Sequence, residues 1–525
     1  MNKKPVKKSV KKIVPKAKAL IKPAKEESAV AAALPKFAKG GSLPVRQAGG
    51  AGGKGASEIQ TLRGFKDMLP AECLIAQHIE DLARSFARAH GFERIETPML
   101  EPTALFVRTV GKQTDVVEKE MYTFVDKGEE SVTMRPEMTA PVCRAYVNHG
   151  MLNQPQPVKL WYSGSCFRYE RPQAGRQREF RQIGFETLGE GHPIVDAELI
   201  AIGFNLMKAL GLDPTVQINS IGTKEARAAY IEKLVEYYRS RRSKICEDDK
   251  RRLARNPLRV LDCKNPECQP IKEGAPQILD SLDDDSKNHF MRVLEYLDEA
   301  GVAYSLNPFL VRGFDYYART VFEFYTVGDD EAAQSALGGG GRYDGLIEML
   351  GGRSTPAAGV GLGVERLIAR MRAKGLDKEI ENRPDVFVAQ LGEAARKKAL
   401  GLVEELRRAG IAASSNMAKD GLKQQLEMAN KNGARFTVIL GQKEILDGTI
   451  IIRDMDSGIQ EICDFKKSAA ELKRKLAVPA LPRHSAPAPV NKEDVSVPEE
   501  EDLDIGFKVE EPEESAAPVE KENDE

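Results

Sequence analysis

Several segments of the chain place arginines and carboxylates where an ordinary β-sheet would carry neutral polar residues. The longest, residues 167–182, reads FRYERPQAGRQREFRQ, which predicts a strand, a charged turn and a second strand. Because strand side chains alternate between two faces, every second residue of this hairpin can share one face if the strands register suitably. The residues expected on that face are Arg168, Glu170, Gln182, Gly184 and Glu186. A face with both cations and carboxylates can bind a zwitterion and a polyphosphate together.

Three further short segments each contain an arginine and a carboxylate. They are RPEMT at 135–139, RGFDYY at 312–317 and GLGVER at 361–366. A solvated hairpin with surface ion pairs would explain one such strand. It would also have to explain the other three segments, so the pattern favours a binding site for charged ligands.

The elements that must position these residues follow from the spacing of apolar side chains. Residues 73–90 carry apolar side chains at helical spacing from Leu74 to Phe86, and Gly91 is a natural stop. The β-rich segments that follow are 94–100, 160–169, 180–188 and 320–327. Sequential strands with few intervening helices favour an antiparallel sheet, and therefore an α+β fold.

The pattern of apolar and charged residues changes along the chain, and these changes indicate its domains. We expect residues 58–383 to form the main domain, with a charged, helix-prone insertion over about 225–300. From Pro384 onward, short buried strands alternate with helical runs. That alternation is typical of a separate α/β domain, here residues 384–478.

Strong charge asymmetry is confined to the two ends of the chain. Residues 1–25 contain ten lysines and no acidic residue, whereas residues 493–525 contain fifteen acidic residues and two lysines. Neither end has periodic apolar positions that could form a core. We therefore expect a disordered basic tail with a Gly-rich linker over 1–57, and a disordered acidic tail over 479–525.

Length and composition exclude several classes of protein. With 525 residues, 41% hydrophobic and 30% charged, the chain is too long for a small binding module. It has no run of about 18 uncharged apolar residues and no apolar segment behind its Lys-rich start, so we expect a cytoplasmic protein without membrane association. The seven cysteines indicate reduced thiols. Cys246, Cys263 and Cys268 hint at a metal cluster, but their spacing is loose, so no bound metal is predicted.

The charged segments, taken in order, resemble the motifs of the class II aminoacyl-tRNA synthetases. FRYERP at 167–172 is similar to motif 2, GLGVER at 361–366 to motif 3, and Gly91 to Pro98 to the dimer-forming motif 1. RGFDYYAR at 312–319 and GGGGRYDG at 338–345 resemble the two signature segments of histidyl-tRNA synthetases. The resemblance covers residues 58–476 and stops before both tails.

The resemblance implies a catalytic domain built on an antiparallel sheet flanked by helices, and a C-terminal anticodon-binding domain. It implies a homodimer that activates L-histidine with ATP and Mg²⁺ and transfers the histidine to the 3′ end of tRNA(His). The tRNA would meet the charged turn, around Arg171, Arg176 and Arg178, at its acceptor end.

Four arginines are the cations that the resemblance assigns to this chemistry. When a carboxylate attacks the α-phosphate of ATP, negative charge accumulates and fixed cations are required. Arg168 is implied to bind the α-phosphate and Arg366 the γ-phosphate, with Arg176 as a further ATP ligand. Arg312 is implied to contact the histidine carboxylate and the α-phosphate, so Arg168 and Arg312 are the expected catalytic residues. A structural ion pair is the alternative for each arginine.

The same resemblance assigns eight residues to the histidine pocket. They are Glu137, Met138, Thr139, Gln182, Glu186, Tyr316, Tyr317 and Tyr343. The family pattern has Glu137, Thr139 and Gln182 accept from the α-ammonium group, while Glu186 and the tyrosines face the imidazole. Packing as ordinary core aromatics is the alternative for the tyrosines.

Two rival functions come from the same fold. The regulatory subunit of ATP phosphoribosyltransferase is a non-catalytic paralogue that usually lacks the C-terminal domain and loses parts of the signature segments. This chain has both the C-terminal domain and the complete signature segments. Synthetases for proline or threonine share motifs 1 to 3 but not residues 312–317.

The basic tail generates a prediction, because it carries no motif residue but can contact nucleic acid. Deleting residues 1–57 should leave ATP–pyrophosphate exchange unchanged and flatten the salt dependence of tRNA binding, since each lost phosphate contact removes counterion release. Filter binding over a range of salt concentrations measures the slope. An unchanged slope would show that the tail does not touch tRNA, and lost exchange would show that it packs on the catalytic domain.

Overall fold

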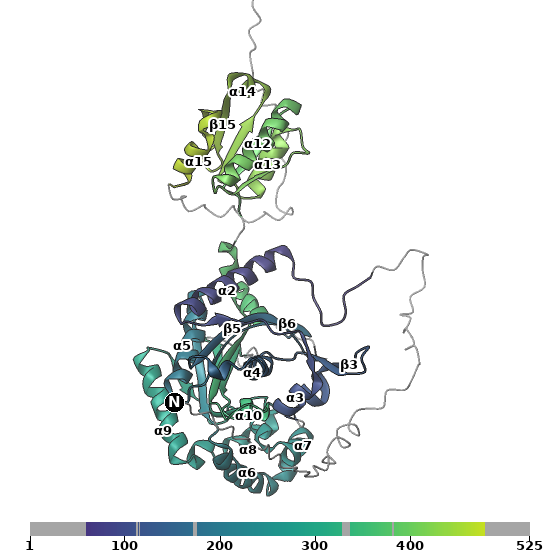
Figure 1. The fold of residues 1–525 in the computed structure, drawn as a ribbon, viewed down its shortest axis with the longest axis vertical. Coiled ribbons are helices and arrows are strands. Elements are labelled where there is room, and N and C mark those ends of the chain that lie inside the picture. The colour runs from purple at the N-terminus through teal and green to yellow at the C-terminus, as the bar shows by residue number, and fades with distance from the viewer. Residues whose placement is uncertain are drawn as a thin grey trace, which may run out of the picture. The chain divides into compact units, whose positions relative to one another are not determined.

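The computed structural model describes residues 59–111, 114, 116–171, 176–327, 336–380 and 383–477 (Figure 1). The predicted tails, 1–57 and 479–525, lie outside these residues, as does the tip of the charged turn at 172–175. Among the helices described, none combines the length and the apolar character needed to cross a membrane.

An eight-stranded sheet organises the main domain. Its strand order is β1-β5-β6-β11-β10-β9-β7-β8. The strands are β1 (Glu93–Arg94), β5 (Val158–Phe167), β6 (Glu179–Leu188), β11 (Ala357–Gly363), β10 (Gly338–Arg342), β9 (Ala318–Thr326), β7 (Pro214–Ser220) and β8 (Tyr304–Leu306). The six central strands are antiparallel, and only the edge pairs β1–β5 and β7–β8 are parallel. The predicted α+β class and antiparallel sheet are confirmed.

The strand predicted at 94–100 is wrong. The chain leaves the large sheet after Arg94 and enters a second sheet at β2 (Leu100–Pro102), which pairs with β4 (Ser131–Met134) and then β3 (Tyr122–Val125). Pro98 lies in the break between the two sheets, and a proline cannot donate to a strand ladder.

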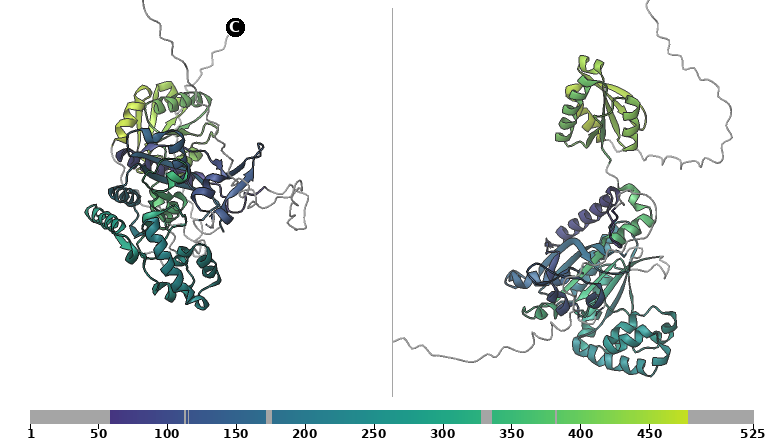
Figure 2. Two further views of the ribbon diagram at one scale, coloured as in Figure 1. Left: turned by 60° about the horizontal axis from the view of Figure 1, so that its bottom comes forward. Right: turned by 90° about the vertical axis from the view of Figure 1, so that its right-hand side faces the viewer.

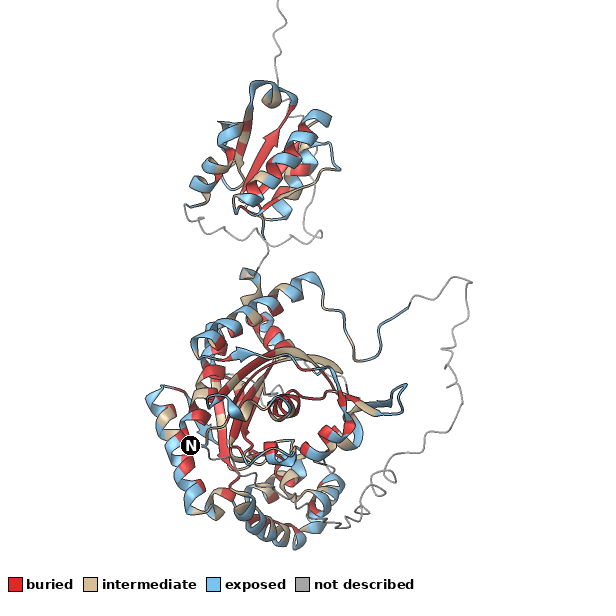
Figure 3. Cartoon of the chain, viewed as in Figure 1, coloured by how far each residue is buried: buried red, intermediate tan, exposed pale blue. Residues whose placement is uncertain are grey.

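Helices cover both faces of the large sheet. α2 (Pro70–Ala89), α5 (Ile194–Ala209) and α11 (Val364–Ala373) pack on one face over a core that includes Ile183 and Phe185 of β6. α4 (Thr139–Asn148) and α10 (Leu346–Met349) lie on the other face, with Tyr162 and Leu160 of β5. Figure 3 shows the buried residues concentrated on the strands and on α4. The helix predicted at 73–90 is therefore confirmed as α2.

The predicted insertion is helical (Figure 2, teal). It contains α6 (Lys224–Arg239), α7 (Glu247–Arg255), α8 (Gln269–Glu273) and α9 (Asp284–Glu299), with short 3₁₀ turns between them. Arg227 of α6 donates to the backbone oxygen of Tyr317, and Asn256 donates to Asp315 at 2.9 Å. These bonds fix the insertion against segment 312–317.

The C-terminal domain has its own sheet, with strand order β13-β12-β14-β15-β16. The strands are β13 (Ala413–Ser415), β12 (Val386–Gln390), β14 (Phe436–Leu440), β15 (Thr449–Asp454) and β16 (Gln460–Asp464). The helices are α12 (Glu393–Arg408), α13 (Leu422–Lys431), α14 (Gln442–Asp447) and α15 (Ser468–Leu476). The predicted alternation of strand and helix is confirmed, and an antiparallel hairpin that was not predicted, β15–β16, extends the sheet.

A buried ion pair ties β10 to the helices behind the sheet. Arg342 is fully buried and donates to the Asp196 carboxylate of α5 from Nη2, at 2.6 Å, and from Nε, at 3.0 Å. His289 of α9 lies 2.7 Å from the other Asp196 oxygen. Burial opposes the charge of Asp196, but Arg342 and His289 hold the pKa of this carboxyl below its ordinary value.

This pair generates a prediction about stability. Arg342→Met should lower the free energy of unfolding by about 3 to 5 kcal/mol, because Asp196 is left buried without its cation. The matched control is Lys374→Met, which removes an exposed pair with Asp213 and should cost about 1 kcal/mol or less. Chemical denaturation of both variants measures the difference. Equal losses would contradict a structural role for the buried pair.

Candidate active site

One cavity of about 1400 Å³ lies over the site face of the sheet, the face that carries Gln182. Nine predicted site residues line it: Glu137, Thr139, Arg168, Arg176, Gln182, Arg312, Tyr316, Tyr317 and Arg366. The other three, Met138, Glu186 and Tyr343, are almost completely buried. The structure therefore brings together side chains from segments separated by up to about 230 residues of sequence.

The register of the β5–β6 hairpin sets the chemistry of the cavity wall. Gly164 pairs with Gln182, Tyr162 with Gly184, and Leu160 with Glu186. Gln182, Gly184 and Glu186 therefore share one face, as predicted. Beyond the end of β5, Arg168 and Glu170 line the same cavity.

Glycines of β10 and β11 provide the space that the polar side chains occupy. Gly359 lies opposite Glu186, and Gly361 lies opposite Gly184, diagonally next to Gln182. A Cβ atom at Gly359 would overlap the Glu186 carboxyl group, and one at Gly361 would overlap the Gln182 amide. Side chains at these positions would therefore displace both polar groups from the sheet.

Glu186 is a buried carboxyl group surrounded by hydroxyl donors. Thr139 donates to its Oε1 at 2.8 Å and Tyr162 at 3.0 Å, while Tyr343 donates to Oε2. Burial raises the pKa of Glu186 to about 8, although the three hydroxyl groups oppose this shift. Tyr162 was not predicted, although continuing the period-two face from Arg168 back along β5, through Cys166 and Gly164, reaches it.

Glu137 holds the start of α4. Its carboxylate accepts backbone N–H groups from Thr139, at 2.7 Å, and Ala140, at 2.9 Å. Burial raises the pKa of Glu137. Met138, also predicted in the histidine pocket, is buried in the same core cluster as Val142, and its place in the pocket stays a prediction.

Two arginines enter the cavity with their planes fixed by neighbours. Arg168 lies over the rings of Phe180 and Phe314, at 5.1 and 5.4 Å from their centroids, and donates to the backbone oxygen of Pro136 at 2.8 Å. Arg312 forms an ion pair with Glu323 of β9. No role for Glu323 was predicted from the sequence.

Arg312 retains one unused donor. Its Nε atom is buried and has no hydrogen-bond partner among the described residues. Burial alone would lower the pKa of Arg312, but the Glu323 carboxylate raises it above its ordinary value. The guanidinium therefore stays charged, and its Nη1 atom lies beside the empty Cβ position of Gly339.

The insertion adds arginines that the sequence analysis missed. Arg252 and Arg255 of α7 and Arg259 of the following 3₁₀ turn line the same cavity as Arg312. Their spacing of three and four residues indicates a common helical face, but nothing in the sequence shows what that face meets. The cavity is therefore more basic than the motif residues alone indicate.

Two arginines of the charged turn form contacts within the protein. Arg178 stacks over the Tyr169 ring at 3.6 Å and donates to the backbone oxygen of Arg63 at 3.0 Å. Arg176 is 3.4 Å from the Glu170 carboxylate. Of the three arginines predicted to meet tRNA, Arg178 therefore has a structural role in this conformation.

Comparisons with known proteins agree with this geometry. The family model described as histidyl-tRNA synthetase matches residues 64–238 and 250–367, and the anticodon binding domain model matches residues 385–475. A histidine–tRNA ligase of Desulfotalea psychrophila is 46% identical over 429 residues, which are 82% of this chain and 98% of that protein.

Two solved structures resemble the chain. Apo histidyl-tRNA synthetase of S. aureus is 35% identical, with a TM-score of 0.67 over 79% of this chain and 100% of that chain. An ATP phosphoribosyltransferase regulatory subunit/histidyl-tRNA synthetase from Bacillus halodurans C, 21% identical over 73% of this chain and 98% of its own, has a TM-score of 0.53 and shares the fold alone. Together with the family models, the site geometry leads to one conclusion: the chain belongs to the histidyl-tRNA synthetase family.

Proposed function

We propose that this protein activates L-histidine with ATP and transfers the histidine to the 3′ end of tRNA(His). The proposal is supported by one observation. A single cavity combines a basic surface with a polar pocket, and a buried carboxyl group lies at the end of that pocket. Arg168, Arg312 and Arg366 line the basic part, and Glu186 lies beneath the pocket. A ligand with phosphates at one end and an imidazole at the other fits this division.

The first half-reaction joins the two substrates. A histidine carboxylate oxygen attacks the α-phosphorus, the bond from that phosphorus to the bridging oxygen of the β-phosphate breaks, and pyrophosphate leaves. In the second half-reaction the terminal ribose hydroxyl of tRNA attacks the histidyl carbonyl, and AMP leaves. Both substrates of the first step are anionic where they meet, so fixed positive charge lowers its barrier.

The arginines take distinct roles in the proposal. Arg168, which contacts two aromatic rings, binds the α-phosphate, and Arg366 binds the γ-phosphate with Arg176 as a further ATP ligand. Arg312, which lines the cavity, contacts the histidine carboxylate and the α-phosphate. Planar guanidinium groups suit phosphate oxygens better than ammonium groups do.

The remaining polar groups hold histidine. Glu137 and Gln182 accept from the α-ammonium group, whereas Thr139, whose hydroxyl donates to Glu186, orients that carboxyl group. Glu186 accepts an imidazole N–H, directly or through the Tyr343 hydroxyl bonded to it. Tyr316 and Tyr317, whose ring centroids are 4.7 Å apart, pack around the ring.

Mg²⁺ binds together with ATP, because this hard cation prefers oxygen ligands and substrate phosphates. The carboxylates of Glu323 and Glu365 line the same cavity and fit that preference. When bound, the ion neutralises phosphate charge.

The proposal extends to the partners and the division of the chain. We assign catalysis to residues 58–383 and anticodon binding to 384–478, in a cytoplasmic homodimer. Met99 and Leu100, just after motif 1, are 55% and 47% exposed, which supports an interface there. Arg171 and Arg176 remain the candidates for the tRNA acceptor end.

ATP–pyrophosphate exchange tested with each amino acid separates this proposal from its rivals. Exchange with histidine alone is the expected result. The regulatory-subunit alternative predicts no exchange with any amino acid, and a proline or threonine synthetase predicts exchange with that amino acid instead.

Arg312 provides a direct test of the mechanism. Arg312→Ala should slow histidyl-adenylate formation by about 100- to 1000-fold, because the charge that develops at the α-phosphate loses its fixed cation. The matched control is Arg239→Ala, an exposed arginine at the end of α6, which should not change the rate. Single-turnover adenylation measures both. Near-normal adenylation by folded Arg312→Ala would remove this residue from the mechanism.

Glu186 provides a test with two independent measurements. Glu186→Gln should lower kcat/KM for histidine by about 100-fold or more, because it replaces the carboxyl group that accepts the imidazole N–H. ATP binding should stay unchanged. The control is Glu198→Gln, a carboxylate that pairs with Lys159 at 2.8 Å and does not line the cavity. Equal weakening of histidine and ATP binding would instead indicate a collapsed sheet.

The same variant should change the pH dependence of stability. The pKa of Glu186 rises from its ordinary value of 4.5 to about 8 on folding, so the folded state keeps this proton where the unfolded chain has lost it. The free energy of unfolding therefore falls as pH rises through this window. The Glu186→Gln side chain does not titrate, so the variant does not lose this free energy. The free energy of unfolding of the variant minus that of wild type should therefore increase by up to about 3 kcal/mol between about pH 5.5 and pH 8.5. Denaturation of the ligand-free proteins measures this difference, and a pH-independent difference would contradict the raised pKa.

A further inference from the structure

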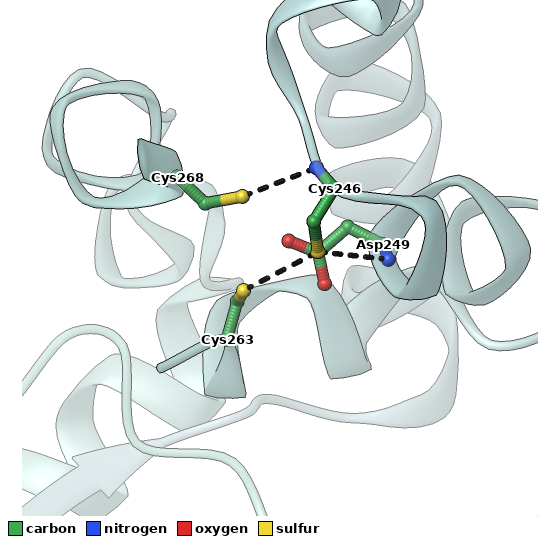
Figure 4. A group of neighbouring side chains, drawn as sticks. All are labelled: Cys246, Asp249, Cys263 and Cys268. Carbon is green, nitrogen blue, oxygen red and sulfur yellow. Dashed lines mark hydrogen bonds between the residues drawn. The ribbon is translucent and has the colours of Figure 1, made fainter. Parts of the chain in front are cut away.

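Four side chains of the insertion converge on one point, although they come from separate short segments. Cys246 immediately precedes α7 and Asp249 lies in its first turn, whereas Cys263 follows one 3₁₀ turn and Cys268 ends another. The three sulfur atoms and a carboxylate oxygen all lie within 4.8 Å of one another. Figure 4 shows the four side chains of this Cys₃Asp cluster pointing toward a common centre.

The distances within the cluster match metal coordination better than a disulfide. The Sγ atoms of Cys246 and Cys263 are 3.9 Å apart. A disulfide needs about 2.05 Å between sulfurs. Two thiolates on one tetrahedral zinc ion, each with a Zn–S bond of about 2.3 Å, are separated by about 3.8 Å.

Asp249 carries a carboxylate oxygen that the described residues leave without a hydrogen bond. The residue is fully buried, and its Oδ1 atom is 3.2 Å from Arg252. Its Oδ2 atom is buried and has no hydrogen-bond partner in the described part of the chain. Such a group costs about 1 to 3 kcal/mol or more. A cation at the centre of the cluster would remove that cost.

Backbone N–H groups point at the sulfurs. The N–H of Cys246 donates to the Sγ atom of Cys268 at 3.3 Å, and the N–H of Asp249 donates to the Sγ atom of Cys246 at 3.4 Å. Donors of this kind stabilise thiolates at the start of a helix and orient metal ligands. The guanidinium of Arg252 similarly orients the Asp249 carboxylate.

We propose that Cys246, Asp249, Cys263 and Cys268 bind one structural zinc ion in a tetrahedral Cys₃Asp site. Three thiolates and one carboxylate suit zinc and are poor ligands for Mg²⁺ or Ca²⁺, which prefer oxygen. Four protein ligands close the coordination sphere, so the ion stabilises structure and has no open position for chemistry. This inference does not rest on the function proposed above.

The proposed ion has a defined structural task. The segment from Cys246 to Cys268 consists of one nine-residue helix and short 3₁₀ turns, which are marginal structures by themselves. It also carries Arg252, Arg255 and Arg259 of the cavity wall. Zinc would therefore fix the backbone that positions these three arginines.

The test uses the full-length protein, purified with a reductant and without a chelator. Elemental analysis should find one zinc ion per chain. Protein stripped of metal should bind one Co²⁺ ion and acquire the sulfur-to-cobalt charge-transfer and visible bands of a tetrahedral thiolate site. Zinc-free protein whose spectrum does not change on Co²⁺ addition would overturn the proposal, as would a Cys246–Cys263 disulfide in wild-type protein.

Variants locate the ion. Cys263→Ser and Cys268→Ser should weaken zinc binding by about 10- to 100-fold or more, as competition with a chromogenic chelator measures. The matched controls are Cys73→Ser and Cys463→Ser, which alter cysteines outside the cluster and should retain zinc. Loss of zinc from a control variant, with retention in the cluster variants, would place the ion elsewhere and overturn the proposal.

The Asp249→Cys variant controls for the possibility that the other variants lose zinc only because they misfold. This change completes a four-thiolate site, so it should retain one metal ion and intensify the sulfur-to-cobalt band. A folded Asp249→Cys variant with an unchanged cobalt spectrum would exclude Asp249 as a ligand. Chelation should also speed tryptic cleavage between residues 242 and 264 in the wild type, and unchanged cleavage would contradict the structural task.

Discussion

The burial of one carboxyl group, that of Glu186, constrains the whole site. Removing a carboxyl group from water is costly unless hydrogen bonds compensate, and here Thr139, Tyr162 and Tyr343 supply them. These donors come from a helix, a neighbouring strand and the signature segment 338–345. The requirement to satisfy one buried group therefore fixes how three distant parts of the chain come together. The same burial raises the pKa of Glu186, which lowers the stability of the protein as pH rises. Substrate recognition would explain why this cost is retained.

Glycine makes this arrangement possible. The signature segment at 338–341 and the motif 3 strand leave their Cβ positions empty, and the side chains of Glu186, Gln182 and Arg312 occupy the space. A sheet with ordinary residues at these positions would have no room for polar groups on its face. In β10 the run of glycines ends at Arg342, which serves the opposite side of the sheet by pairing with Asp196. One short strand thus supports both the site and the packing behind it.

The basic part of the cavity is assembled from two sources. Arg168, Arg312 and Arg366 belong to the sheet and its loops, whereas the insertion contributes Arg252, Arg255 and Arg259. Carboxylates such as Glu323 pair with some of these cations and limit their mutual repulsion in the absence of ligand. The insertion is consequently part of the cavity wall, and the Cys₃Asp cluster gives that wall a means of holding its shape.

The sequence by itself determined the fold class, the helical insertion and the C-terminal alternation of strand and helix, and it indicated nine residues that line the cavity. Period-two alternation placed Gln182 and Glu186 on one face, and helical spacing located α2, because both periods are local properties of the chain. The break at Pro98 and the hairpin β15–β16 were missed, since edge pairing depends on which strands become neighbours. Tertiary structure alone decided that Tyr162 bonds Glu186, that Glu323 pairs with Arg312, and that three cysteines and Asp249 meet. Each of these is a contact between residues whose separation in sequence bears no relation to their distance in space.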